Sequence, residues 1–357
     1  MTADREAGPA LVLPFHAHAL PAELVDIAPA AVLERWCAVD RSSQDPHLVA
    51  VPHDDGTGWS GAALLTARPG TTYAKIVDVV GDLPAVLVAV LEHARERGLV
   101  QLKWEGWSVA PEAAADAGFA PLRAPVVGDN GLSSAYVRWL EGAVVAEPAY
   151  RRQSEHFTCA AVVALTAQVQ TGAIAEAEVD RAAELTLWRR ATNFAACEPV
   201  GLGVAVRRTW PDAPVVVCLD TERPVLLESY AEPERQWRAV LQQASRGEAA
   251  ATGVPIEGLR LEIPELRQAL AGGEHVLLVL SLAQMLGYEV PHWVLCHAAV
   301  DGAVVIEDPW VDEPRGETWV DAHLLPVPDA ALAAMSALGQ DGYRGAVRIG
   351  RPRWGMG

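Results

Sequence analysis

Four side chains spread between residues 153 and 308 have the types and spacing needed for nucleophilic chemistry. Cys159 stands at the start of the apolar segment 158–170, which is predicted to be a helix. A thiol at a helix start lies near free backbone amides and the positive end of the helix dipole, and both lower its pKa. Gln153 lies six residues upstream, where its amide could donate a hydrogen bond to an oxyanion beside the sulfur. His292 could accept the thiol proton, and Asp308 could orient the imidazole.

A predicted hairpin decides whether His292 and Asp308 can meet. Strands are expected over 292–300 and 303–308, joined by a tight turn. A two-residue loop would place His292 and Asp308 on opposite faces of the hairpin. A three-residue loop, with Gly302 in the left-handed conformation, would place them diagonally on the same face, within reach of a carboxylate–imidazole hydrogen bond. We therefore predict the three-residue loop or an equivalent bulge.

Neighbouring residues could take the same roles, or none. A cysteine at a helix start is by itself more often a small core residue than a nucleophile. Glu307 is the rival carboxylate and His297 the rival base, although the three-residue loop would put His297 on the opposite face from His292. His156 lies close to the thiol in sequence but is expected to be exposed. The remaining residues of interest are Cys197, Cys218 and Cys296, interpreted as structural, and Trp188, Trp293 and Trp310, which could line a cleft.

Composition excludes several classes of function. The 357-residue chain carries 46 acidic and 28 basic residues, a formal net charge of −18 that would repel nucleic acid. Only Lys75 and Lys103 are lysines. No apolar run reaches the roughly 18 residues of a membrane helix, and the first residues do not resemble a signal peptide. Five scattered cysteines without a C-x-x-C pair suit a reducing cytoplasm rather than a disulfide framework or a zinc site. Arginine- and alanine-rich usage is typical of a high-GC bacterial genome.

The pattern of elements predicts an α+β protein with two domains. The first domain is expected over residues 1–142, a linker over 143–150 and the second domain over 151–357. Asp82 is the expected N-cap of the most strongly periodic helix of the first domain. The predicted helices cover 30–39, 83–97, 111–117, 158–170, 176–190, 228–245 and 329–338, and the predicted strands cover 47–52, 60–67, 73–80, 100–104, 119–127, 135–140, 215–219, 276–282, 292–300, 303–308 and 346–349.

The second domain resembles the papain-like cysteine peptidases of the bacteriocin-processing, double-glycine leader peptidase type. The matching positions are Gln153, Cys159, His292-Trp293-Val294 and Asp308-Pro309. The resemblance implies a papain-like fold with Cys159, His292, Asp308 and Gln153 as catalytic residues, and neither a metal nor an organic cofactor. Relatives usually carry glycine after the cysteine, whereas this chain has Ala160-Ala161.

The first domain is more weakly similar to the GNAT acyltransferase fold. The order of its predicted elements and the segment Asp116-Ala-Gly-Phe-Ala-Pro-Leu-Arg123 carry the similarity. The family binds the CoA pyrophosphate with a glycine-rich loop at a helix N-terminus. This chain has Val80-Gly81-Asp82-Leu83-Pro84 there, which lacks one amide hydrogen and adds a negative charge. We therefore expect this GNAT-like domain not to work as an acetyltransferase.

The expected function is cysteine-dependent acyl transfer at a peptide or amide carbonyl through a thioester intermediate. With water as acceptor the protein would be a peptidase or amidase. With an amine it would be an amide-forming acyltransferase in natural-product or modified-peptide biosynthesis. The expected partners are a peptide or small-molecule amide substrate, an acyl carrier or modified peptide, and a second copy of the chain as a homodimer, with no nucleic acid and no membrane. Two alternatives stay open: a catalytically silent binding or scaffold protein, and an acyl-CoA-dependent N-acetyltransferase whose second domain binds substrate.

Overall fold

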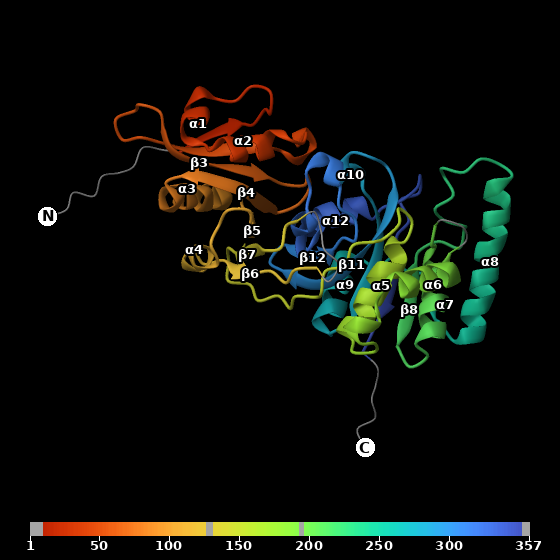
Figure 1. Ribbon diagram of the computed structural model, residues 1–357. Coiled ribbons are helices and arrows are strands. Elements are labelled where there is room, and N and C mark those ends of the chain that lie inside the picture. The colour runs from red at the N-terminus through yellow and green to blue at the C-terminus, as the bar shows by residue number, and fades with distance from the viewer. Residues whose placement is uncertain (1–9, 126–130, 193–195, 352–357) are drawn as a thin grey trace, which may run out of the picture. The chain divides into compact units, whose positions relative to one another are not determined.

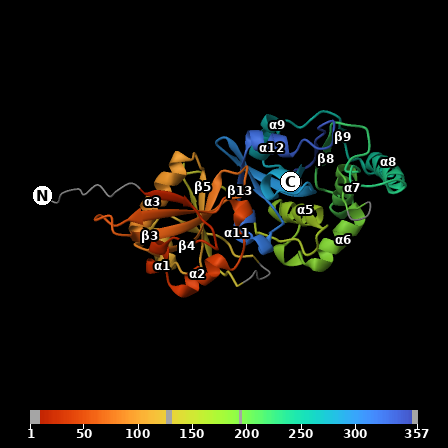
Figure 2. The same ribbon diagram turned by 90° about the horizontal axis from the view of Figure 1, so that it is seen from above.

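The computed structural model describes residues 10–125, 131–192 and 196–351, which fold into two compact units (Figure 1 and Figure 2). Each unit is built on one seven-stranded sheet with helices packed on it, which confirms the predicted two-domain α+β class. In these described stretches, no helix is long and apolar enough to cross a membrane. The first residues of the chain and the end of the strand predicted over 119–127 lie outside them.

Unit 1 has its strands in the order β1-β2-β3-β4-β5-β7-β6, with β4 and β5 parallel and all other neighbours antiparallel. Its elements are β1 (Leu11–Pro14), α1 (Ala22–Ile27), α2 (Ala30–Cys37), η1 (Ser42–Gln44), β2 (His47–Pro52), β3 (Trp59–Thr66), β4 (Tyr73–Gly81), α3 (Leu83–Glu96), β5 (Gln101–Glu105), α4 (Pro111–Asp116), β6 (Ala120–Pro121) and β7 (Ala135–Trp139).

Helices cover both faces of this sheet because alternate strand residues point to opposite sides. Helix α3 lies on one face and α2 on the other (Figure 2). Val49 and Val51 of β2 belong to the same core cluster as residues of α3, and Leu48 belongs to the same cluster as Trp36 of α2. The carboxylate of Asp82 accepts the backbone N–H of Ala85 and caps α3, as predicted. The N-terminus of α3 therefore already holds a negative charge.

A segment from late in the sequence completes unit 1. Residues 311–321 belong to this unit rather than to the second one. They contain η3 (Glu313–Arg315) and most of α11 (Trp319–Ala322). The Arg68 guanidinium donates to both carboxylate oxygens of Glu317, at 2.6 and 2.7 Å. The Asp321 carboxylate accepts hydrogen bonds from Tyr73 Oη at 2.9 Å and from Lys75 Nζ at 2.5 Å.

Both lysines of the chain hold this segment. Lys75 also contacts Glu105 at 2.8 Å, and Lys103 Nζ donates to the carbonyl of Val320 at 2.7 Å. Both side chains are completely buried, so each ammonium needs these partners to offset its desolvation. The expectation of one continuous second domain over 151–357 therefore differs from the structure at residues 311–321, because their acidic side chains neutralise cations buried in unit 1.

Unit 2 has the strand order β13-β12-β11-β10-β14-β8-β9, antiparallel except for β8 and β9. Its elements are α5 (Cys159–Gln170), η2 (Glu176–Glu178), α6 (Arg181–Ala191), α7 (Pro199–Thr209), β8 (Val215–Leu219), α8 (Glu234–Thr252), β9 (Ile256–Glu257), α9 (Ile263–Ala271), β10 (His275–Ser281), α10 (Ala283–Leu286), β11 (Pro291–Val300), β12 (Ala303–Glu307), β13 (Leu325–Pro328), α12 (Asp329–Met335) and β14 (Gly345–Ile349).

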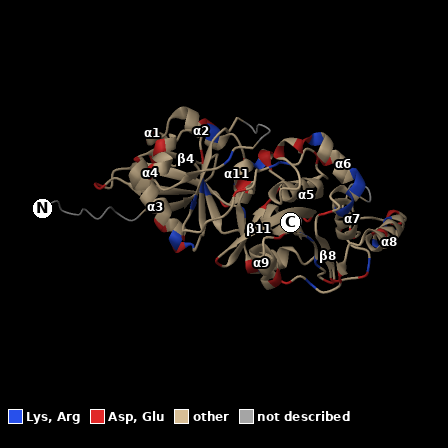
Figure 3. Ribbon diagram, turned by 90° about the horizontal axis from the view of Figure 1, so that it is seen from below, with Lys and Arg blue, Asp and Glu red and all other residues tan. Residues whose placement is uncertain are grey.

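The central helix of unit 2 is α5, which packs on β10 and β11. It carries no charged side chain along its whole length, as its uniform tan colour shows (Figure 3), and its first ten residues are buried. A helix that is apolar on all sides must lie inside a protein. Helices α9 and α12 cover the other face of the sheet (Figure 2). Cys159 is therefore fixed at the end of the most deeply buried helix of the unit.

Several helices of unit 2 differ from the sequence expectation. The helix predicted over 176–190 starts only at Arg181, as α6, and α10 has no predicted counterpart. The helix predicted over 228–245 is α8 (Glu234–Thr252) and starts after Pro233. Helix α7 was not predicted, because Gly201 and Gly203 disfavour a helix. A side chain at Gly203 would begin only 2.5 Å from a methyl group of Val217, so this helix needs glycine to approach β8 closely. Helix α9 was not predicted either.

Candidate active site

Cys159 is the first residue of α5 and is 9% exposed. Burial of the thiol raises its pKa. The charge of His292, a hydrogen bond with the His292 side chain, and hydrogen bonds from the backbone N–H groups of Trp293 and Ala160 lower it, and the net result is a lowered pKa. Cysteine reacts through its thiolate, and a lowered pKa favours that form.

The imidazole of His292 connects the thiol to a carboxylate. His292 lies on β11, and its Nε2 is 2.7 Å from Oδ1 of Asp308, which follows the end of β12. Burial of the imidazole lowers its pKa, but the charges of Asp308 and Cys159 outweigh burial and raise it to about 10. Since Nε2 faces Asp308, Nδ1 is the ring nitrogen left for the sulfur. The three groups thus lie in the order thiol, imidazole and carboxylate.

Asp308 is completely buried and held by its own backbone as well as by its side chain. Its N–H donates to the carbonyl of Ala322 at 3.0 Å, and its carbonyl accepts the hydroxyl of Tyr150 at 3.0 Å. Its Oδ1 also accepts the N–H of Trp310 at 2.8 Å. These contacts leave the carboxylate little freedom to turn away from His292.

The hairpin between these residues reaches this geometry through a bulge. Val300 pairs with Ala303 across a two-residue loop, and Gly302 is left-handed with φ +64°. The register then shifts at His297, so that Leu295 pairs with Glu307. The predicted three-residue loop is wrong, and the alternative of an equivalent bulge is what the structure contains. A bulge adds one residue to one strand, which returns His292 and Asp308 to the same face.

Gln153 lies beside the thiol but also has structural contacts. It is buried and lines the same cleft as Cys159. Its Nε2 donates to the carbonyl of Glu155 at 2.8 Å, and its backbone N–H donates to Pro309 at 2.9 Å. An amide nitrogen carries two hydrogens, so the Glu155 contact leaves one for a ligand. Its role at an oxyanion stays a prediction.

A buried carboxylate shapes the loop that leads into α5. Glu184 of α6 accepts the backbone N–H of Ser154 at 2.8 Å and the hydroxyl of Thr158. The segment from Gln153 to Cys159 is therefore tied to α6. No sequence pattern pointed to Glu184.

Of the rival residues, His156 lines the cleft at Cys159, whereas Glu307 and His297 do not. Oε1 of Glu307 is 3.2 Å from Nε2 of His297, and its Oε2 is 2.7 Å from Nδ1 of His323. His156 is exposed, as predicted, and its ring stacks 5.2 Å from that of Trp310. Burial raises the pKa of the Cys197, Cys218 and Cys296 thiols above the ordinary value. Cys197 nevertheless lines the cleft, which its sequence context did not indicate.

The cleft at Cys159 has a volume of about 440 Å³. Its walls are mostly apolar and aromatic, and they include Trp293 and Trp310 but not Trp188. Trp188 instead stacks on Phe157 at 4.7 Å. Further lining residues that no sequence pattern singled out are Leu226, Ser229, Tyr230, Leu282, Tyr288, Glu289, Val290 and Pro291.

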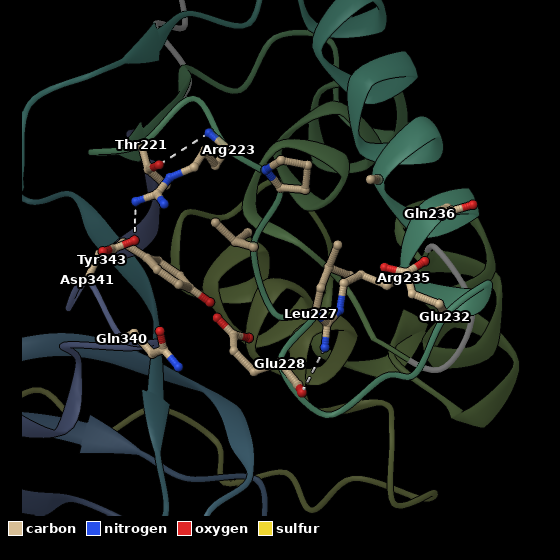
Figure 4. Close-up of a pocket in the computed structure, with 13 residues that line it drawn as sticks. Thr221, Arg223, Leu227, Glu228, Glu232, Arg235, Gln236, Gln340, Asp341 and Tyr343 are labelled. Carbon is tan, nitrogen blue, oxygen red and sulfur yellow. Dashed lines mark hydrogen bonds and ion pairs between the residues drawn. The ribbon is translucent and has the colours of Figure 1, made fainter.

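One wall of the cleft separates it from a second pocket. This pocket of about 670 Å³ is lined by charged side chains, among them Glu228, Arg235 and the ion pair between Arg223 and Asp341 (Figure 4). In the loop between β8 and α8, Leu226 lines the cleft, whereas Val225 and Leu227 line the second pocket. Leu226 has φ +57°, and its N–H donates to the Tyr343 hydroxyl at 2.8 Å. Leu226, which lines the cleft, is therefore held by Tyr343, which lines the second pocket.

The comparisons with known proteins agree with the sequence interpretation. The sequence matches the family described as "Peptidase_C39 like family" over residues 148–350. That match covers more than half of the chain, and the chain belongs to this family. No curated protein matches the sequence.

Solved structures of GNAT acyltransferases match part of the chain. A protein assigned to the GNAT acetyltransferases from Desulfovibrio desulfuricans is 21% identical, with 27% of this chain and 69% of that chain covered and a TM-score of 0.22. One assigned as an acyl-CoA N-acyltransferase from Klebsiella pneumoniae is 15% identical over 37% of this chain and 97% of that chain, with a TM-score of 0.27. A GNAT acetyltransferase from Staphylococcus aureus is 12% identical over 37% and 99%, also with a TM-score of 0.27. TM-scores this low do not transfer an activity to unit 1.

Proposed function

We propose that this protein catalyses cysteine-dependent acyl transfer at the carbonyl of a peptide or another amide. The observation that carries the proposal is the array of Cys159, His292 and Asp308, in which Cys159 and His292 line one cleft and Nε2 of the imidazole is 2.7 Å from the buried carboxylate. Membership of the Peptidase_C39 like family supports it. A lowered thiol pKa beside a raised imidazole pKa is the electrostatic state that such a reaction needs.

The reaction proceeds in two halves. The Cys159 thiolate attacks the carbonyl carbon and forms a carbon–sulfur bond, while the carbonyl oxygen becomes an oxyanion. The Gln153 amide and the Cys159 backbone N–H stabilise that oxyanion. The carbon–nitrogen bond then breaks, and the leaving amine takes a proton from His292, which leaves a thioester on the sulfur. In the second half, water or an amine attacks the thioester and gives a proton to His292. The acyl group departs, and the thiolate returns.

The walls of the cleft restrict the acyl group that can enter. Among the described residues that line it, Glu289 is the one carboxylate, and there is no lysine or arginine. An anionic substrate would find no lysine or arginine there to pair with, whereas a neutral or cationic one fits. Aromatic walls such as Trp310 and Tyr288, whose Nε1 and hydroxyl are 2.9 Å apart, favour a bulky apolar group next to the reacting carbonyl.

The first test is the pH dependence of iodoacetamide labelling, followed for each cysteine by peptide mass spectrometry. In the wild type we expect Cys159 to label rapidly well below pH 7, because activated thiols titrate between roughly 3.5 and 7.5 rather than near 8.5. In His292→Ala, labelling at pH 6 should fall by about a hundredfold. Cys197 is an internal control, because it lines the same cleft with a raised pKa. Labelling of Cys159 that rises only near pH 8.5 and ignores the mutation would reject acyl transfer and leave a binding protein.

A second measurement identifies the acceptor. The protein is mixed with peptide and small amide substrates and quenched in acid. Mass spectrometry then detects an acyl group on Cys159. Water and a small primary amine then compete for the accumulated thioester. Release as the free acid only makes the protein a peptidase or amidase, and amide formation makes it an acyltransferase.

A further inference from the structure

A second histidine–carboxylate cluster lies on the other side of the strand end that carries Asp308. Its centre is His323, which is completely buried. Its Nδ1 is 2.7 Å from Oε2 of Glu307, and its Nε2 is 2.9 Å from Oε1 of Glu147. Glu307 also accepts the N–H of Leu324 at 3.0 Å and lies 3.2 Å from His297.

The contacts of His323 define its charge. Each ring nitrogen faces a carboxylate oxygen, and carboxylates only accept hydrogen bonds, so both nitrogens must carry a proton. Burial lowers the pKa of His323, but the two glutamates outweigh burial and raise it. For the Glu307 carboxyl, burial instead raises the pKa, but His323 and His297 outweigh burial and lower it to about 2. The cluster is thus a buried chain of carboxylate, imidazolium and carboxylate.

This cluster connects residues 147–153, which precede Cys159, to Asp308 and its neighbours. Glu147 lies in the stretch expected to be a linker, yet it contacts His323. The Tyr150 ring stacks 5.5 Å from His323, and its hydroxyl donates to the Asp308 carbonyl at 3.0 Å. The Gln153 N–H donates to Pro309 at 2.9 Å. The two segments are therefore joined at three successive places next to Asp308.

We propose that Glu147, Tyr150 and His323 are positioning residues that fix the Asp308 carboxylate and, through it, the imidazole of His292. They touch neither the substrate nor the thiol. The inference rests on the proposed function, because it assigns these residues to the same reaction. Its physical basis is that a 2.7 Å charged hydrogen bond is sensitive to small displacements of either partner, and second contacts of this kind hold such groups in place.

The test uses variants at the accessible end of the cluster, since His323 is buried between charges and its replacement could unfold the protein. Glu147→Gln removes the charge of a side chain that is 27% exposed, and Tyr150→Phe removes only the hydroxyl that reaches Asp308. Matched controls are Glu248→Gln, which breaks the exposed pair with Arg208 in the same unit, and Tyr136→Phe, a buried tyrosine of unit 1.

We expect Cys159 labelling at pH 6 to fall about three- to tenfold in Glu147→Gln and in Tyr150→Phe, with its pH midpoint raised by roughly half a unit to one unit. The controls should label like the wild type. A residue that acts through Asp308 should also lose its effect when Asp308 is already changed. We therefore expect Tyr150→Phe to alter labelling little in an Asp308→Asn background.

The outcomes separate this inference from the proposed function. If wild-type Cys159 has no reactive form below pH 7, the proposed function fails and takes the positioning role with it. If the wild type is reactive and both variants keep its pH midpoint, the positioning role alone is overturned. It is overturned as well if the variants melt at lower temperature while their midpoints are unchanged, because the cluster would then only stabilise the fold.

Discussion

Two histidine–carboxylate pairs stand back to back at the end of β12. Asp308 pairs with His292 and Glu307 pairs with His323, each at 2.7 Å and each across sixteen residues of sequence. Consecutive residues of a strand point to opposite faces, so neighbouring carboxylates serve two separate sites. Each pair joins a buried histidine to a buried acidic residue at the same distance, and the pairs differ in what faces the other ring nitrogen.

That third group decides what each pair can do. His323 faces a second carboxylate, so it keeps both protons and has none to exchange. His292 faces the thiol of Cys159, a group that can give up a proton, and the cleft gives a substrate access to both. A buried imidazole beside a carboxylate is therefore not by itself a catalytic pair. The chemistry depends on a third group that titrates and is open to a ligand.

Replacing Glu307, the carboxylate that pairs with His323, should have the largest effect on the free energy of unfolding. Glu307→Gln leaves the charge of His323 buried with one partner fewer, and breaking a buried pair in this way destabilises by about 3–5 kcal/mol. We expect that loss in the free energy of unfolding, measured in urea. Labelling of the folded fraction at pH 6 should fall no more than about tenfold.

Acid should reproduce part of this loss in the wild type. A carboxyl whose folded pKa is lowered from 4.5 to about 2 stabilises the fold above pH 4.5, and this contribution disappears as the pH falls through about 2. The difference corresponds to roughly 3 kcal/mol. Glu307→Gln should lack this acid-dependent part of the unfolding curve. If both proteins lose the same unfolding free energy at low pH, other carboxyl groups must cause that loss.

Replacing Asp308, the carboxylate of the proposed catalytic pair, should affect labelling more than stability. Asp308→Asn removes the charge that raises the pKa of His292 to about 10, so the thiolate–imidazolium state becomes less favourable. We expect Cys159 labelling at pH 6 to fall by about ten- to thirtyfold and its midpoint to rise by about one unit. Asp329→Asn, which breaks a partly exposed pair with Arg267, is the control. Labelling equal to the control would remove Asp308 from the site.

The sequence allowed one of the two pairs to be predicted. Cys159 at a helix start, His292 at a strand start and Asp308 after the next strand form an ordered pattern that local rules can detect, even though the loop type was wrong. His323 and Glu147 have no such pattern, because their contact joins positions 176 residues apart that look like ordinary polar surface. Only tertiary packing shows that the two side chains are in contact.

The same limit applies to the segment 311–321. Glu317 and Asp321 look like solvent-facing residues of a polar connection, and their basic partners lie more than 240 residues earlier. Local periodicity contains no information about such pairs. The order of the two domains could therefore be predicted from the sequence, whereas the exchange of this segment into unit 1 could not.

The smallest expected effect concerns the residue after the nucleophile. Ala160 is 1% exposed and lines the cleft, at a position where the resemblance leads one to expect glycine. Its contact with the sulfur comes from the backbone N–H, which glycine also has. Ala160→Gly should therefore leave the pH midpoint of Cys159 labelling unchanged, and lower the free energy of unfolding by about 0.5–1 kcal/mol through the greater flexibility of glycine in a helix. Urea unfolding and the labelling profile measure the two quantities separately. A midpoint that moves by more than about half a unit would mean that the methyl group helps to exclude water from the thiol, and that the catalytic pair, unlike the pair at His323, is adjusted by an apolar neighbour.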